Sequence, residues 1–161
     1  MMRVGLGYDI HRLQEDCGAA ITLCGLSIPC DRRLIAHSDG DVVFHALTDA
    51  ILGACAAGDI GEHFPDSDPR WRGAPSQHFL SAALTMAGER GWVLVNCDIN
   101  IIAQYPRLGP WKPALRSALA NALDLLPEAA SIKARSNEGL DAIGTGQAIA
   151  AQAVVLLQAR A

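Results

Sequence analysis

The sequence lacks the features that mark membrane, exported and disulfide-stabilised proteins. No stretch approaches the roughly 20 apolar residues needed to cross a bilayer, and the segment from Met1 to Asp9 has no long apolar run typical of an export signal. The five cysteines are odd in number and form no C-x-x-C pair, so neither a disulfide framework nor a zinc ribbon is expected. We expect a cytoplasmic protein without a membrane partner.

Several catalytic motifs are also missing. The chain has no Walker A loop, no G-x-G-x-x-G, no H-E-x-x-H and no G-x-S-x-G, which removes the basis for a dinucleotide-binding or serine-hydrolase function. Its net charge of −4 argues against a nucleic-acid partner, which would require a basic face. An anionic ligand must therefore be held locally, by a metal, helix N-termini or single cationic side chains.

The residues that are present predict one α/β domain over residues 1–161. Half of them are hydrophobic, which is enough for a core. We expect an α+β sandwich with helices on one face of a single sheet, and self-association over the other face. Hydrophobic periodicity predicts strands at 3–11, 93–103 and 131–136, a hairpin at 20–23 and 26–28, and helices from Ser38 to Gly58, at 77–90 and at 110–126, while 149–157 stays open between strand and helix.

Three segments offer metal-binding or phosphate-binding groups. In a strand, Asp9 and His11 share one face while Ile10 faces the core, although such a triplet alone is weak evidence for a metal site. On the first helix, His45 is either a third ligand oriented by Asp49 or a member of a solvated polar stripe. We place Ser38 at the N-cap of that helix, where free backbone N–H groups attract phosphate.

Two further segments have an open interpretation. Residues 59–75 form a loop rich in Gly, Pro, Asp and Ser, which is typical both of functional loops and of ordinary turns. Lys133, Arg135, Ser136 and Glu138 place cations, a hydroxyl and a carboxylate close together. Glu138 is either a ligand for a hard cation such as Mg²⁺ or a plain surface residue.

Taken together and in this order, the motifs resemble the 2-C-methyl-D-erythritol 2,4-cyclodiphosphate synthase family. The strings that carry the resemblance are GYDIH at 7–11, AHSDGD at 36–41, HALTDA at 45–50, GDIG at 58–61, FPDSDP at 64–69 and IIAQ at 101–104. The resemblance implies a mixed, four-stranded type of sheet facing the three-fold axis of a homotrimer, with sites between subunits. It also implies cyclisation of 4-diphosphocytidyl-2-C-methyl-D-erythritol 2-phosphate with release of CMP, a phosphorus–oxygen lyase reaction of the non-mevalonate isoprenoid pathway.

The resemblance assigns roles residue by residue. Asp9, His11 and His45 match zinc ligands, Glu138 matches the residue that engages Mg²⁺ or Mn²⁺, and His37 and Ser136 match groups that stabilise the transition state. The expected substrate-binding positions are Asp9, Ile10, His11, His37, Ser38, Asp59, Ile60, Gly61, Phe64, Pro65, Asp66, Ser67, Asp68, Ala103, Arg107, Leu108, Gly109, Arg135, Ser136, Asn137, Glu138, Ala142 and Thr145.

The C-terminal third departs from the family pattern. Arg135 replaces a threonine, Arg107 replaces the usual lysine of the cytidine loop, and Ala142 stands where the family has a phenylalanine that contacts substrate. Two functions from different classes therefore remain open. One is an active cyclodiphosphate synthase; the alternative is a metal-binding paralogue with weak activity that acts as a nucleotide-binding or interaction protein.

One departure gives a first prediction. In the family, an arginine near the three-fold axis can bind the diphosphate of an isoprenoid in the central cavity, and here that position is Thr145. We expect this chain to bind no isoprenoid diphosphate there, because the cation that neutralises the ligand is missing. Native mass spectrometry of the purified protein checks this, and an isoprenoid diphosphate retained on the axis would contradict it.

Overall fold

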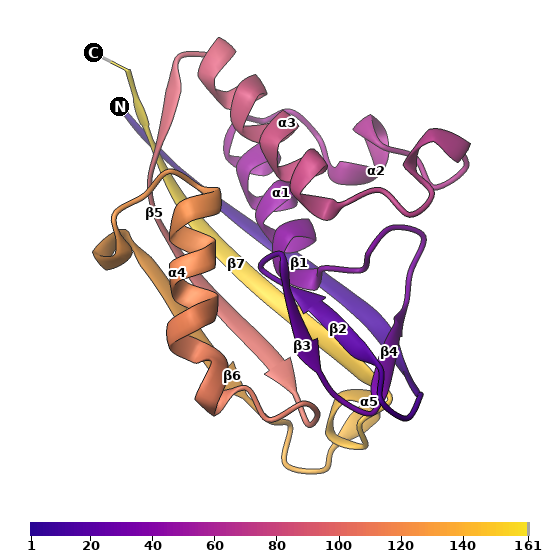
Figure 1. Cartoon of the computed structure of the whole chain (residues 1–161). Helices are drawn as coiled ribbons and strands as arrows, with labels where there is room; N and C mark the ends of the chain where they lie inside the picture. Colours follow the sequence, from indigo (N-terminus) through magenta and orange to yellow (C-terminus); the bar gives the residue numbers. More distant parts are fainter. Residues whose placement is uncertain (161) are drawn as a thin grey trace.

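The computed structural model describes residues 1–160 and has one mixed sheet at its centre. The sheet holds five strands in the order β4-β1-β7-β5-β6, in which β5 and β6 run parallel and the other neighbours antiparallel. Figure 1 shows the two chain ends side by side, because β1 and β7 pair along their length. The strands are β1 (Met2–Glu15), β4 (Arg32–Ile35), β5 (Trp92–Ala103), β6 (Ala130–Arg135) and β7 (Ala148–Ala159); β2 (Ala20–Leu23) and β3 (Leu26–Pro29) form a separate hairpin.

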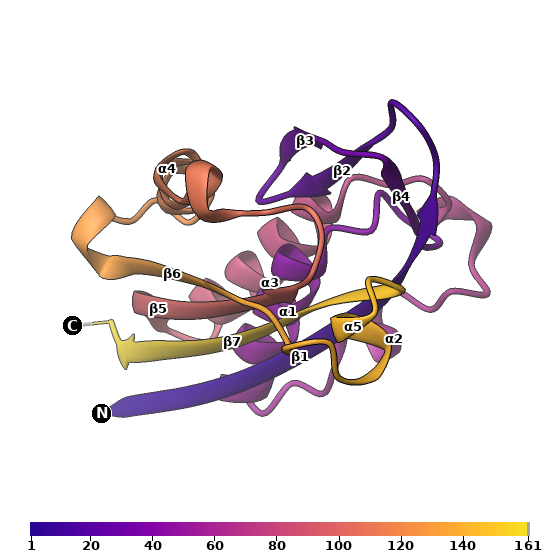
Figure 2. The ribbon, with the colours of Figure 1, turned by 90° about the horizontal axis from the view of Figure 1, so that it is seen from below.

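The long helices and the β2–β3 hairpin lie on one face of the sheet, as expected, and the opposite face is largely open (Figure 2). The short helix α5 lies at one end of that open face. The helices are α1 (Val42–Ala54), α2 (Ile60–His63), α3 (Ser76–Glu89), α4 (Lys112–Ala122) and α5 (Asp141–Gly144), with short 3₁₀ turns η1 (Pro69–Trp71), η2 (Gly109–Trp111) and η3 (Pro127–Ala129). No helix in the described residues is long and apolar enough to span a membrane.

The predicted elements are confirmed in kind, with corrections in detail. The open segment 149–157 is a strand, because its branched residues sit in the centre of the sheet between β1 and β5. The sheet has five strands rather than four, since the short β4 adds to the edge of β1. The first helix begins at Val42 and ends at Ala54, so Ser38 and Gly58 lie outside it.

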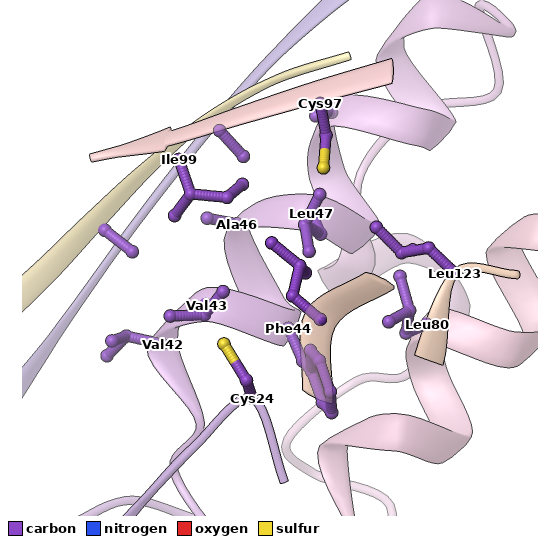
Figure 3. Close-up of a cluster of buried hydrophobic side chains, with 14 of the residues drawn as sticks. Cys24, Val42, Val43, Phe44, Ala46, Leu47, Leu80, Cys97, Ile99 and Leu123 are labelled. Atoms are coloured by element: carbon purple, nitrogen blue, oxygen red, sulfur yellow. The ribbon is translucent and has the colours of Figure 1, made fainter. Parts of the chain in front are cut away.

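The core lies between the sheet and the helices that cover it. Nearly the whole of α1 is buried, because one side of it faces β1 and β7 and the other side faces α3 (Figure 3). Phe44, Leu47 and Ile51 are at most 1% exposed. Cys24 and Cys97 are free thiols that pack in the same cluster as small apolar groups.

Two glycines bring β1 against α1. A Cβ atom at Gly5 would lie 1.8 Å from the carbonyl oxygen of Ala50, and one at Gly7 would lie 1.8 Å from that of Ala46. These contacts involve backbone, which cannot swing away as a flexible side chain can. Both glycines therefore lie against the backbone of the helix. This close approach places the strand that carries Asp9 beside the helix that carries His45.

Substitution of Gly7 by alanine tests this packing. We expect Gly7→Ala to lower the free energy of unfolding by about 3 kcal/mol or more, because the helix must move off the strand. Urea denaturation measures the change. The control is Gly53→Ala in α1, where an added Cβ meets nothing within 4 Å; there we expect no loss, or a gain of roughly 0.5–1 kcal/mol. Equal effects at the two positions would contradict the close-approach argument.

The open face of the sheet carries an apolar stripe, which we define as Met2, Val4, Leu6, Tyr8 and Ile10 of β1. All five side chains are at least 43% exposed, and Leu6 reaches 71%. Alternation along the strand puts them on the face opposite α1. The stripe continues on β7, where Val154 is 42% exposed. An apolar stripe of this length is typical of a surface that a partner covers.

Candidate metal centre

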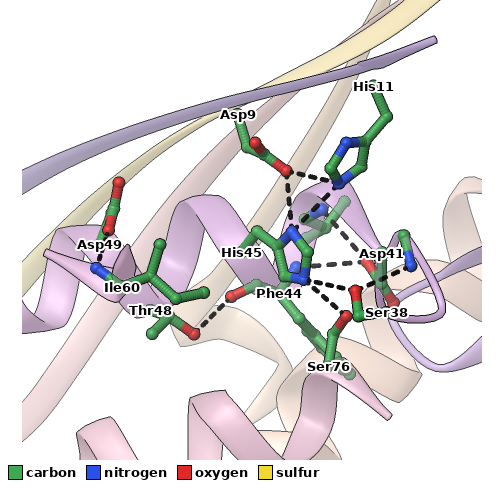
Figure 4. Close-up of polar contacts among 12 residues, drawn as sticks. Asp9, His11, Ser38, Asp41, Phe44, His45, Thr48, Asp49, Ile60 and Ser76 are labelled. Atoms are coloured by element: carbon green, nitrogen blue, oxygen red, sulfur yellow. Dashed lines mark hydrogen bonds and ion pairs between the residues drawn. The ribbon is translucent and has the colours of Figure 1, made fainter. Parts of the chain in front are cut away.

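Three predicted ligands meet between β1 and α1 (Figure 4). Oδ2 of Asp9 lies 3.0 Å from Nε2 of His11 and 3.0 Å from Nδ1 of His45. The two ring nitrogens lie 3.1 Å apart. All three side chains are mostly buried, with 12–25% of their surface exposed. Residues 36 positions apart in the sequence therefore form one compact triangle.

The carboxylate in this triangle is ionised. Burial alone would raise the pKa of Asp9, but the hydrogen bonds and electrostatic interactions with His11 and His45 outweigh burial and hold this pKa well below its usual range. The group therefore stays a carboxylate at neutral pH. An ionised oxygen and two imidazole nitrogens form an ordinary ligand set for zinc and other divalent transition metals.

The size of the triangle fits a single cation. A tetrahedral zinc site with ligand distances of about 2.0–2.1 Å has ligand atoms roughly 3.3–3.4 Å apart. The observed separations of 3.0–3.1 Å would need to open by only a few tenths of an ångström. Two facing imidazole nitrogens can share only one proton between them, whereas a central cation satisfies both lone pairs and the carboxylate together.

Two predicted orientations near the triangle are wrong. Ile10 does not face the core; it is 43% exposed on the open face, because Asp9 and His11 take the face toward α1. Asp49 does not orient His45; its Oδ1 accepts the backbone N–H of Ile60 at 2.8 Å and so fixes the start of α2. Desolvation raises the pKa of Asp49.

The N-cap of α1 is Asp41 rather than Ser38. The Asp41 carboxylate accepts the backbone N–H groups of Val43 and Phe44 at 3.1 and 3.2 Å, and that of Gly25 at 2.8 Å. Burial raises the pKa of Asp41 to about 6, and the backbone hydrogen bonds only partly oppose this shift. The side chain that begins the helix is therefore also a buried titratable group.

Asp41 makes a pH-dependent contribution to stability. Between its ordinary pKa of 3.8 and the folded value of about 6, the folded state binds more protons than the unfolded state. The free energy of unfolding should therefore fall as pH rises through this window, by about 3 kcal/mol in total. The asparagine in Asp41→Asn does not titrate and keeps an oxygen acceptor, so the free energy of unfolding of this variant should lack this pH dependence. Urea denaturation at pH 4 and pH 8 checks the difference, and parallel pH profiles would contradict it.

A cavity of about 370 Å³ opens over the metal triangle. Its walls come from the triangle, from the turn before α1, from α2 and the loop after it, and from two aromatic residues. The structure thus brings ten predicted residues together with two that were not predicted, Trp71 and Phe79. The lining consists of Asp9, His11, His37, Ser38, His45, Ile60, Gly61, Phe64, Pro65, Asp66, Trp71 and Phe79.

Three predicted residues of the same loop do not line this cavity. Asp59 caps α2 by accepting the backbone N–H of Glu62 at 3.0 Å. Asp68 caps η1 and pairs with the Arg70 side chain, which lowers the pKa of Asp68. Ser67 is exposed. The turn-forming interpretation therefore accounts for Asp59 and Asp68. The functional interpretation fits the part of the loop between them that lines the cavity, from Ile60 to Asp66.

A second cavity of about 480 Å³ lies at the C-terminal ends of β5 and β6. It contains six predicted residues and four outside the expected substrate-binding positions, including Lys112. Arg107, Lys112 and Arg135 give it a cationic wall. The lining consists of Ala103, Gln104, Pro106, Arg107, Leu108, Gly109, Lys112, Ala134, Arg135 and Ser136. The two cavities share no lining residue.

Five further predicted residues lie outside both cavities. Glu138 is exposed, and its Oε1 accepts the hydroxyl proton of Ser136 at 3.3 Å. The Nδ2 of Asn137 donates to Asp141 at 2.8 Å. Ala142 and Ile10 line a third hollow beside the open face, and the Thr145 hydroxyl bonds the Asp141 carbonyl at 2.9 Å. Within this chain, Glu138 does not line the cavity over the metal triangle.

Comparison with known proteins assigns the family. Residues 2–158 match the model of the YgbB family. The chain belongs to the YgbB family. Among YgbB-family relatives, the 2-C-methyl-D-erythritol 2,4-cyclodiphosphate synthase of Halorhodospira halophila is 51% identical over 98% of this chain and 96% of its own length. The bifunctional enzyme IspD/IspF of Sinorhizobium medicae is 49% identical over 93% of this chain, but this chain spans only 37% of that protein.

Solved structures of the YgbB family share the fold. A structure of 2C-methyl-D-erythritol-2,4-cyclodiphosphate synthase is 44% identical, with a TM-score of 0.89 over 97% of this chain and all of that one. A form of that synthase described as bound to CDP is 42% identical, also with a TM-score of 0.89. The bifunctional IspDF of Campylobacter jejuni has a TM-score of 0.92 and 40% identity over 99% of this chain and 42% of that chain.

Proposed function

We propose that this chain converts 4-diphosphocytidyl-2-C-methyl-D-erythritol 2-phosphate into 2-C-methyl-D-erythritol 2,4-cyclodiphosphate and CMP. The observation that carries the proposal is the triangle of Asp9, His11 and His45 at the floor of a cavity lined by the family's binding segments. The relative of 51% identity bears the name of this synthase. An oxygen of the 2-phosphate forms a bond to the β-phosphorus, the bond from that phosphorus to the bridging oxygen breaks, and CMP leaves with the oxygen.

We assign zinc to the triangle and Mg²⁺ or Mn²⁺ to Glu138. The carboxylate and two imidazoles suit zinc, whereas a lone carboxylate beside phosphates suits a hard cation. Zinc bound there would supply a Lewis acid and a template for the β-phosphate. Such cations would let a chain of net charge −4 bind a strongly anionic substrate. Phosphoryl transfer requires mainly alignment and charge neutralisation, so no nucleophilic side chain is needed.

Residues of the first cavity hold the diphosphate end of the substrate. Among residues 1–160, the buried Nε2 of His37 has no hydrogen-bond partner, so it is available to a phosphate oxygen. Ser38 stands next to it on the cavity wall. Phe64 and Phe79 pack with ring centroids 4.8 Å apart and give the wall an apolar surface that excludes water. These groups orient the reacting phosphates and strengthen the local electrostatics.

Residues of the second cavity hold the cytidine and its phosphates. Arg107 and Arg135 replace residues that are smaller or differently shaped in the family pattern, and both line this cavity. The guanidinium of Arg135 is already held by Asn100, whose Oδ1 accepts its Nε–H at 3.1 Å. We propose that Arg135 adds charge to the wall without crowding it. Ser136 supplies the hydroxyl assigned to transition-state stabilisation.

The separation of the two cavities supports a homotrimer with sites between subunits. The two cavities share no lining residue, and a neighbouring subunit that supplied one of them would complete a single site. The apolar stripe of β1 offers the surface for such a contact, and exposed apolar surface of this kind drives association. We propose that the open sheet faces meet around a three-fold axis.

We also propose a cytoplasmic location. Cys24, Cys55 and Cys97 pack as buried thiols in the core, which suits a reducing compartment.

The test is an assay of CMP release from the diphosphocytidyl substrate with Zn²⁺ and Mg²⁺ present. Phosphorus NMR should show the cyclic diphosphate forming in equal amount. A correctly metallated trimer that releases no CMP would refute the proposal and favour the alternative, a metal-binding paralogue with a nucleotide-binding or interaction role.

A further inference from the structure

The metal ligand His45 has two ring nitrogens in different surroundings. Its Nδ1 faces Asp9 and His11, while its Nε2 faces away from them into the protein (Figure 4). There Nε2 lies 2.8 Å from the Ser76 hydroxyl and 3.1 Å from the Ser38 hydroxyl. The state of Nε2 decides whether Nδ1 carries a proton or a free lone pair.

The Ser76 hydroxyl is itself held by Asp39. The Ser76 backbone N–H donates to Asp39 Oδ2 at 3.1 Å, and the Ser76 hydroxyl lies in a short hydrogen bond with Asp39 Oδ1. The same Oδ1 accepts the backbone N–H of Asp41 at 3.2 Å. Ser76 is completely buried, so water does not compete for these contacts. The first residue of α3 is therefore fixed to the turn that precedes α1.

The direction of these hydrogen bonds follows from proton counting. A carboxylate only accepts hydrogen bonds, so the Ser76 hydroxyl donates its single proton in the hydrogen bond to Asp39. The Ser76 oxygen is then left with lone pairs and accepts a proton from His45 Nε2. With the proton on Nε2, Nδ1 presents its lone pair toward Asp9 and His11, which is the form that binds a cation.

We infer that Ser76, held by Asp39, is a positioning residue that fixes the tautomer and orientation of His45 for metal binding. Neither residue lines the cavity over the metal triangle. The inference rests on the proposed metal site, and it gives the first residue of α3 a role in orienting the His45 ring. The hydrogen bond with Ser76 fixes the orientation of the His45 ring.

Metal affinity tests the inference independently of catalysis. We expect Ser76→Ala to weaken Zn²⁺ binding by roughly 10- to 100-fold, measured on the full chain by competition with a chelator. Co²⁺ substitution should show an altered absorption spectrum, because one ligand is no longer oriented. Ser76→Thr keeps the hydroxyl and should restore affinity. Asp39→Asn removes the negative charge that accepts the hydrogen bond of the Ser76 hydroxyl, so it should also weaken Zn²⁺ binding.

The matched control is Thr48→Val on α1. Thr48 is also completely buried, and its hydroxyl donates to the Phe44 carbonyl at 2.7 Å rather than to a metal ligand. Its removal should leave Zn²⁺ affinity and the Co²⁺ spectrum unchanged. Wild-type affinity in Ser76→Ala would overturn this inference alone. A wild-type chain that binds no divalent ion would refute the metal site of the proposed function, and this inference with it.

Discussion

Replacement of His45 by alanine should abolish zinc binding and lower CMP release by at least roughly 10³-fold. Two ligands remain after the change, and a carboxylate with one imidazole holds zinc far more weakly than three converging groups. The fold should survive, because the His45 ring lies at the edge of the core, against the cavity. Metal analysis of the purified protein and the CMP assay measure both effects.

The control for this variant is His78→Gln, because His78 is exposed on α3 and does not line the cavity. It should keep the metal and the activity. Circular dichroism and size-exclusion chromatography should give the same secondary structure and oligomeric state for both variants and the wild type. Full activity of His45→Ala without zinc would show that the triangle is not the catalytic metal centre.

Replacement of Leu6 by aspartate should dissociate the proposed trimer. The side chain is 71% exposed in the single chain, so the fold itself tolerates the change. In an assembly that covers the stripe, each new carboxylate would lose its water without gaining a partner, which costs several kcal/mol per copy. Light scattering should then find monomers. CMP release should fall by about 10²-fold or more, because the two halves of each site are no longer held together.

Leu126→Asp is the control for the oligomer. Leu126 is 74% exposed, but it lies before η3 and away from the apolar stripe. It should leave both the trimer and the activity intact. A trimer that persists in Leu6→Asp would mean that the stripe on β1 is not the contact surface.

Local pattern was sufficient to predict much of the site. Alternation along β1 places Asp9 and His11 on one face. The helical spacing around His45 predicts the helix that carries the third ligand. What the pattern could not supply is the distance between these segments, which depends on Gly5 and Gly7 allowing strand and helix into contact. Only the resemblance to a known family indicated, from the sequence, that the segments with Asp9, His11 and His45 form one site.

Other features depend on tertiary structure and were missed or wrong. Ile10 was expected in the core because it is apolar, but the core side of β1 is taken by the glycines and the ligands. Ser38 has the chemistry of an N-cap, yet Asp41 reaches the free N–H groups of the first turn. Ser76 gave one weak signal, a serine directly before a predicted helix. Its contact with His45 spans 31 residues and could not be read from spacing.

A crystal structure of the zinc-loaded protein, with anomalous diffraction recorded at the zinc edge, tests the metal centre most directly. We expect a peak bound by Asp9 Oδ2, His11 Nε2 and His45 Nδ1 in every subunit, with the His45 Nε2 still hydrogen-bonded to the Ser76 hydroxyl. A map with no peak between β1 and α1, or with zinc bound only by other residues, would contradict the proposed metal centre.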